Sequence, residues 1–106
     1  MYYVSHIVEY PIFEPAEGGY YYAGTQIVEC LEYESWKEAN KQFQKMRKAF
    51  LRDYEYDKER IIDRQYGGCG KYKYPCVIYN SRLIGEGEQI QLTRQKPVEY
   101  GWHPYC

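Results

Sequence analysis

Residues 35–52, "SWKEANKQFQKMRKAFLR", decide the fold that this sequence predicts. Ser35 and Glu38 have the S-x-x-E spacing of a capping box, in which each side chain satisfies a backbone N–H left unpaired in the first helical turn. Apolar residues then recur at three- and four-residue spacing, as on one face of an α-helix: Trp36, Ala39, Phe43, Met46, Phe50 and Tyr54. The pattern predicts an amphipathic helix whose apolar stripe packs on a sheet.

Two segments before this helix have strand character. Residues 2–10 and 20–33 are rich in β-branched and aromatic residues. The prolines and glycines from Pro11 to Gly19 predict a loop between them, and Gly24 is a candidate bulge or bend. Because the connection is short, we expect an antiparallel hairpin. One face of its first strand carries, at a spacing of two, Val4, His6 and Val8.

The chain after the helix predicts further strands. Residues 59–66 fit either a strand or a continued helix, residues 74–80 and 88–94 read as strands, and the tail 97–106 reads as irregular. The sequence therefore predicts one compact α+β domain over residues 1–106. Its expected architecture is ββ-α-(β)ββ in two layers, with one main amphipathic helix packed across an antiparallel sheet of four to five strands.

Charge is unevenly distributed along the chain. Residues 1–36 contain six acidic and no basic residues, residues 37–52 contain six basic and one acidic residue, and residues 53–106 contain eight of each, which gives the net charge of −1. At 100° per residue, five of the helix cations lie within about 80° of one another, opposite the apolar stripe. We call this set the basic ridge: Lys37, Lys41, Lys45, Lys48 and Arg52.

The basic ridge requires compensation, because like charges four residues apart destabilise a helix. One source is internal, since Glu29, Glu32 and Glu34 precede the helix. The other is an external partner, either a protein with an acidic patch or a polyanion. The pI of about 6.1 argues against a dedicated nucleic-acid domain, since such domains are usually basic overall. A protein partner with an acidic patch is therefore favoured.

Tyrosine accounts for 15 of the 106 residues, too many for one small core to bury. Two groups are candidate partner-binding residues: the consecutive Tyr20, Tyr21 and Tyr22, and the alternating Lys71, Tyr72, Lys73 and Tyr74. Such rings anchor protein interfaces, or stack on bases while neighbouring cations contact phosphate.

Catalytic and metal motifs are weak. The sequence "GGCGK" lacks the spacing of a P-loop, and no base is placed to activate Cys69. A zinc site could use Cys69, Cys76, His103 and Cys106, but the C-x6-C spacing is wider than the usual two to four intervening residues. We therefore expect no enzyme, no cofactor and reduced thiols. The absence of a secretory-signal pattern and of an apolar run of about 18 residues predicts a cytoplasmic protein without membrane contact.

In general character, a small, tyrosine-rich, charge-segregated α+β chain resembles accessory proteins of phages and mobile elements, including inhibitors of bacterial defence systems. The expected function is accordingly a non-catalytic protein-interaction module or inhibitor. Two alternatives remain: a nucleic-acid or nucleotide-binding protein that uses tyrosine stacking with Lys and Arg on phosphate, and a small zinc-stabilised domain.

Overall fold

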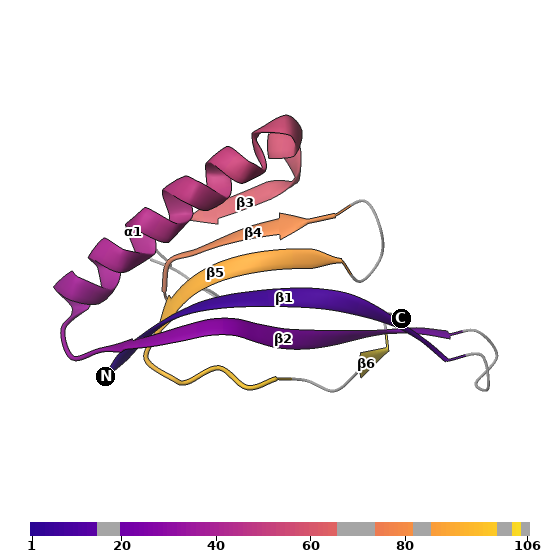
Figure 1. Cartoon of the computed structure of the whole chain (residues 1–106), viewed down its shortest axis with the longest axis horizontal. Coiled ribbons are helices and arrows are strands. Elements are labelled where there is room, and N and C mark those ends of the chain that lie inside the picture. Colours follow the sequence, from indigo (N-terminus) through magenta and orange to yellow (C-terminus); the bar gives the residue numbers. More distant parts are fainter. Residues whose placement is uncertain (15–19, 66–73, 82–85, 100–102, 105–106) are drawn as a thin grey trace.

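A computed structural model describes residues 1–14, 20–65, 74–81, 86–99 and 103–104. One long helix crosses one face of an antiparallel sheet, which confirms the predicted two-layer α+β fold (Figure 1). The elements in chain order are β1 (Tyr2–Glu14), β2 (Tyr20–Tyr33), α1 (Trp36–Asp53), the 3-10 helix η2 (Glu55–Arg60), β3 (Ile61–Arg64), β4 (Cys76–Asn80), β5 (Gly87–Thr93) and the two-residue β6 (His103–Pro104).

The sheet has the strand order β3-β4-β5-β1-β2-β6, and all neighbours are antiparallel. β1 lies between β2 and β5, so the last long strand of the chain pairs with the first. The expected β1–β2 hairpin is present, and it extends beyond the shorter strands at one end of the sheet (Figure 1). The pairing of β1 with β5 is therefore a long-range contact that joins the two halves of the chain.

Helix α1 begins and ends where its sequence predicts. Ser35 has an extended backbone, and its Oγ accepts a hydrogen bond from the Glu38 N–H at 3.3 Å, as an N-cap does. At the other end the Tyr54 N–H donates to the Phe50 carbonyl oxygen at 3.1 Å. The helix then gives way to η2 at Glu55.

The core lies between α1 and the sheet. Phe43 has no exposed surface, and it belongs to one buried cluster with Val4, Ala39, Phe50, Val77, Tyr79, Ile90 and Leu92. Trp36, Met46 and Tyr54 pack half-buried against this cluster, so the predicted apolar stripe is confirmed. Val8, which shares the predicted core face of its strand with Val4, is only half-buried, and so is Ile78 of β4. Ile78 follows the buried Val77, so the alternation of a strand turns it to the other face.

The loop expected to begin at Pro11 begins later. β1 continues to Glu14, and Pro11 lies opposite Ala23 of β2. Pairing of β1 with β5 stops at Glu9, so this part of β1 has only one strand neighbour among the described residues. Proline, which has no N–H to donate, is tolerated on such an edge.

The bulge in the hairpin is not at Gly24. His6 pairs with Glu29 and Ile7 with Ile27, which leaves Val28 as the extra residue of β2. Gly24 has a different role, because a Cβ at this position would lie 2.6 Å from Cζ of the Tyr10 ring. A glycine is required there so that the tyrosine ring can lie against the backbone.

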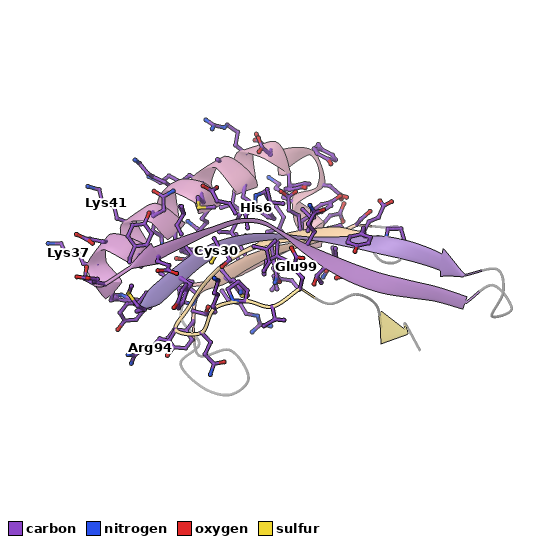
Figure 2. The ribbon with its side chains drawn as sticks, turned by 60° about the horizontal axis from the view of Figure 1, so that its bottom comes forward. His6, Cys30, Lys37, Lys41, Arg94 and Glu99 are labelled. Carbon is purple, nitrogen blue, oxygen red and sulfur yellow. The ribbon has the colours of Figure 1, made fainter. Side chains whose placement is uncertain are left out.

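The structure also specifies two further segments, residues 59–66 and the tail 97–106. In the segment 59–66, the 3-10 helix η2 ends at Arg60 and β3 covers Ile61–Arg64, so the strand alternative holds for those four residues and α1 does not continue into the segment; residue 66 lies outside the described residues. The tail is not wholly irregular, because β6 pairs with β2. The Glu99 carboxylate accepts a hydrogen bond from the Ile27 N–H at 2.9 Å and ties the tail to β2 (Figure 2).

Phe43→Ala should lower the free energy of unfolding by about 3–5 kcal/mol, because it removes a fully buried ring and leaves a cavity. Urea denaturation followed by circular dichroism measures the change. Lys41→Ala, two residues away on the exposed face, is the control and should change stability by less than about 0.5 kcal/mol. An unchanged midpoint for Phe43→Ala would show that this helix face does not form the core.

Candidate functional site

The basic ridge lies on the face of α1 that points away from the sheet. All five of its side chains are exposed, and Lys37 and Lys41 project outward from the first turns of the helix (Figure 2). None of the five makes an ion pair with any residue that the structure describes. The ridge is thus a row of solvated cations on a helix whose opposite face is buried.

The acidic residues expected to balance the ridge do not pair with it. Glu29, Glu32 and Glu34 are exposed, and among the described parts of the chain none of them forms an ion pair. Among the described residues, these three carboxylates therefore compensate the ridge only through their longer-range field, which salt screens.

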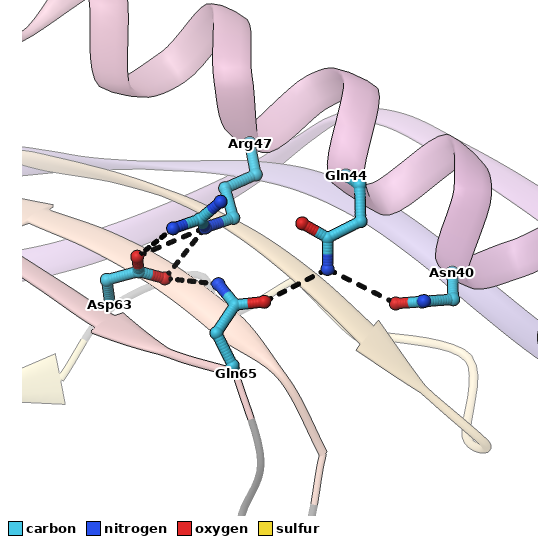
Figure 3. A network of polar contacts seen from close by, with 5 residues as sticks. All are labelled: Asn40, Gln44, Arg47, Asp63 and Gln65. Carbon is cyan, nitrogen blue, oxygen red and sulfur yellow. Dashed lines mark hydrogen bonds and ion pairs between the residues drawn. The ribbon is translucent and has the colours of Figure 1, made fainter.

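The sixth helix cation, Arg47, has a different role. Its Nε lies 3.0 and 3.1 Å from the two carboxylate oxygens of Asp63 on β3 (Figure 3). Gln65 donates to the same carboxylate at 2.8 Å, and its own Oε1 accepts from Gln44, which also donates to Asn40 at 3.3 Å. The hydrogen bond from Arg47 is the main cause that lowers the pKa of Asp63. This network joins the side of α1 to the sheet edge, so Arg47 serves the fold.

A groove of about 570 Å³ lies where β5 ends, beside the start of α1. We call it the Tyr74 groove, and its lining includes Tyr74, Gln91, Arg94, Gln95 and Lys96. Its described lining contains two cations and no carboxylate.

Aromatic packing holds two lining residues of the Tyr74 groove against the core. The Tyr74 ring lies 6.4 Å from that of Trp36, which contacts the ring of Tyr2 edge-on. The Arg94 guanidinium lies 5.2 Å from the centre of the Tyr2 ring. A cation–π contact of this kind holds a guanidinium in place without neutralising its charge.

Most of the other predicted site residues lie outside the described residues or are placed only by their backbone. Lys71, Tyr72 and Lys73 are outside the described residues, and Tyr20, Tyr21 and Tyr22 are placed only as the backbone of β2. Of the predicted aromatic and basic groups, the structure brings together the five ridge residues and separately places Tyr74 in its groove.

Most of the residues of the possible zinc site also lie outside the described residues. Cys69 and Cys106 lie outside the described residues, and of His103 only the backbone is placed. Cys76 is a buried free thiol, and burial raises its pKa. Within the described ranges no three His, Cys, Asp or Glu side chains are grouped as metal ligands.

Sequence reasoning missed a polar network on the helix side of the sheet. The Glu88 carboxylate of β5 contacts His6 Nε2 of β1 and accepts a hydrogen bond from the Tyr54 hydroxyl at the end of α1. The Tyr54 ring stacks on Tyr79, with centres 4.0 Å apart and planes at 14°. The Tyr79 hydroxyl donates to the buried Asp57 carboxylate at 2.8 Å, and this bond is the main cause that raises the pKa of Tyr79 to about 12.

The one sequence signal for this network was His6, which the strand spacing puts on the core face between two valines. Its neighbour on β5, Ile90, is buried, and Glu88 lies one step further along the same face. Polar residues at inward strand positions need partners. The partner of His6 is Glu88, and the pairing of β1 with β5, which are far apart in the sequence, brings the two side chains together.

Comparison with protein-family models, with curated proteins and with solved structures found no match. Within the described residues, no helix is long and apolar enough to cross a membrane.

Tyr79→Phe should lower the melting temperature at neutral pH, because it leaves the Asp57 carboxylate buried without this donor. Because the pKa of Tyr79 is raised in the folded protein, its hydroxyl stabilises the fold fully below pH 10, the pKa of tyrosine in the unfolded chain. This stabilisation is lost as the pH rises to about 12. The difference between wild type and variant should therefore shrink over that interval. Thermal melts from pH 7 to 12 test this, and a difference independent of pH would contradict the assignment.

Proposed function

We propose that this chain is a small non-catalytic binding module whose basic ridge meets an acidic patch on a protein partner. The observation that carries the proposal is the ridge itself: five exposed cations on one helix face, with no ion pair among the described residues. A folded domain keeps such self-repelling charge most readily where a partner offsets it.

The setting of the ridge supports this use. From Lys37 to Arg52 it spans 15 residues, or about 22 Å of helix at 1.5 Å per residue. The buried stripe on one side and the bond between Arg47 and Asp63 on another hold α1 rigidly on the sheet. A rigid row of like charge steers the approach of an oppositely charged surface and orients it on contact.

Binding is also better supported than catalysis. His6 is engaged by Glu88, and Cys76 is buried with a raised pKa, whereas a nucleophilic thiol needs a lowered one. The small size and charge segregation fit an inhibitor of the kind found among phage and mobile-element accessory proteins. We propose antagonism of a host-defence protein as the setting in which the ridge acts.

Lys41→Glu combined with Lys45→Glu should weaken partner binding by about tenfold or more, mainly through slower association, because it reverses charge in the middle of the ridge. Stability should be almost unchanged, since both side chains are exposed. The partner is first captured from host extract on wild-type protein, and rates are then measured by surface plasmon resonance at several salt concentrations.

The matched control is Lys58→Glu with Arg60→Glu. It makes the same change in net charge at two exposed residues of η2, away from the ridge. Equal loss of binding in both double variants would indicate a general effect of charge. Normal binding together with a lowered melting temperature in the ridge variant would show that the ridge is balanced within the chain.

The Tyr74 groove favours a second candidate function, nucleotide or single-stranded nucleic-acid binding. The ring of Tyr74 offers a stacking surface, Arg94 and Lys96 offer cations for phosphate, and the Gln91 and Gln95 amides offer hydrogen bonds to base edges. This combination is the chemistry that aromatic and basic grooves use on nucleotides.

If this second function holds, Tyr74→Ala should weaken binding of a short oligonucleotide by about 1–3 kcal/mol per stacked base. Lys96→Gln should make the log–log salt dependence shallower by about one unit if it contacts one phosphate. Fluorescence anisotropy measures both, with Val98→Ala on the same groove wall as the control. An affinity that none of these variants changes would exclude the groove as the binding site.

A further inference from the structure

A second groove, of about 470 Å³, lies at the opposite end of β5, where α1 ends. Four tyrosines line it: Tyr10 of β1, Tyr54 at the end of α1, Tyr56 of η2 and Tyr79 of β4. We call it the tyrosine groove. It is separate from the basic ridge and the Tyr74 groove, and the inference below does not depend on the proposed function.

Two of these rings are exposed to solvent. Tyr56 is 79% exposed and Tyr10 is 39% exposed. Single exposed apolar residues are ordinary on protein surfaces. Here, however, two exposed rings border one groove whose other tyrosines, Tyr54 and Tyr79, are partly or fully buried. Aromatic surface gathered around a hollow indicates a contact with something that fills it.

The rings that line the groove are electron-rich. Tyr54 stacks on Tyr79, and the Tyr56 ring lies 6.2 Å from that of Tyr54 at 40°. The hydroxyls of Tyr54 and Tyr79 both donate to carboxylates, those of Glu88 and Asp57. A phenol that donates to a carboxylate gains electron density, which makes its ring face more negative. Negative ring faces attract cations.

The charged residues around the groove are also negative, like the ring faces. Its described lining includes Glu9 and Glu86 and no Lys or Arg. The groove therefore has the opposite polarity to the Tyr74 groove, which is lined by Arg94 and Lys96. The adjoining residues 82–85, which include Arg82, lie outside the described chain, so the test below includes that side chain.

The position of the Tyr10 ring depends on a feature of the backbone. It lies so close to Gly24 that any Cβ there would fall 2.6 to 2.8 Å from ring and hydroxyl atoms. The hairpin thus keeps a glycine where a side chain would displace this ring from its position in the groove.

We propose that the tyrosine groove binds an alkylated ammonium group. The four rings, together with Val8 and Pro11, supply apolar contact surface, while Glu9, Glu86 and the electron-rich rings give it negative potential. A primary ammonium is strongly hydrated and loses that water at a cost. An alkylated ammonium carries its positive charge within an apolar shell, so it matches both properties. The group is either a free quaternary amine or a methylated lysine side chain in a peptide.

The decisive experiment titrates the full chain with choline and, in parallel, with 3,3-dimethylbutan-1-ol, which has the same shape without the charge. Chemical shifts of the groove residues in two-dimensional NMR spectra report binding. Choline should bind about fivefold or more tightly than the neutral alcohol. Equal affinity of the two compounds, or no binding of choline, would overturn the proposal.

Two peptides of identical sequence, one with lysine and one with trimethyllysine, distinguish the sources. Tighter binding of the trimethyllysine peptide than of choline supports a peptide ligand, while equal binding supports a free amine; both agree with the proposal. Preference for unmodified lysine would contradict it.

Variants locate the site. Tyr56→Ala should weaken choline binding by about fivefold, whereas Tyr56→Phe, which keeps the ring, should retain it. The 79% exposure of Tyr56 means that folding should survive the change, and a thermal melt checks this. Gly24→Ala should weaken binding by displacing Tyr10. An affinity unaffected by Tyr56→Ala would overturn the assignment.

Two further variants serve as controls. Lys41→Glu with Lys45→Glu should leave choline binding unchanged, so failure of the proposed ridge function and failure of this inference give different results. Arg82→Ala removes the cation nearest the groove in sequence. If this variant binds choline as tightly as the wild-type protein does, or more tightly, the result supports recognition by the rings and carboxylates. Weaker binding by the variant would contradict the proposal.

Discussion

Burial of the apolar stripe of α1 on the sheet is the constraint on which the rest of this structure depends. Phe43 sits without exposed surface in a cluster that includes strand residues Val4, Val77 and Leu92. Because a helix has a fixed period, burying one stripe determines which residues face water. The basic ridge is exposed for that reason, and its charges stay fixed in space relative to the sheet.

The same sheet carries opposite chemistries at the two ends of β5. Beside the start of α1, Tyr74 lies with Arg94 and Lys96; beside its end, tyrosines lie with Glu9 and Glu86. Each groove combines aromatic rings with charge of one sign, so each suits a ligand of the other sign. A chain with a net charge of −1 thereby has one groove lined by cations and another lined by acidic residues.

Much of the fold was predictable because its signals are local. The N-cap at Ser35, the apolar stripe of α1 and the strand alternation at Ile90 and Leu92 each depend on neighbours within a few residues. The errors arose where a distant element changed the outcome. β1 runs on through Pro11, where among the described strands it pairs only with β2 and a proline is tolerated, and the bulge falls at Val28, where the hairpin register shifts.

The sequence by itself determined the two-layer α+β fold and the exposure of the basic ridge, since helix and strand periodicity decide both. Tertiary structure alone decided which polar groups meet. Glu88 joins His6 to Tyr54, and Tyr79 reaches Asp57, which connects β1, β4, β5, η2 and the C-cap of α1. The tyrosine groove is likewise assembled from residues as far apart as Val8 and Gly87. No local pattern encodes such contacts, because they exist only once long-range strand pairing and helix packing have brought these side chains together.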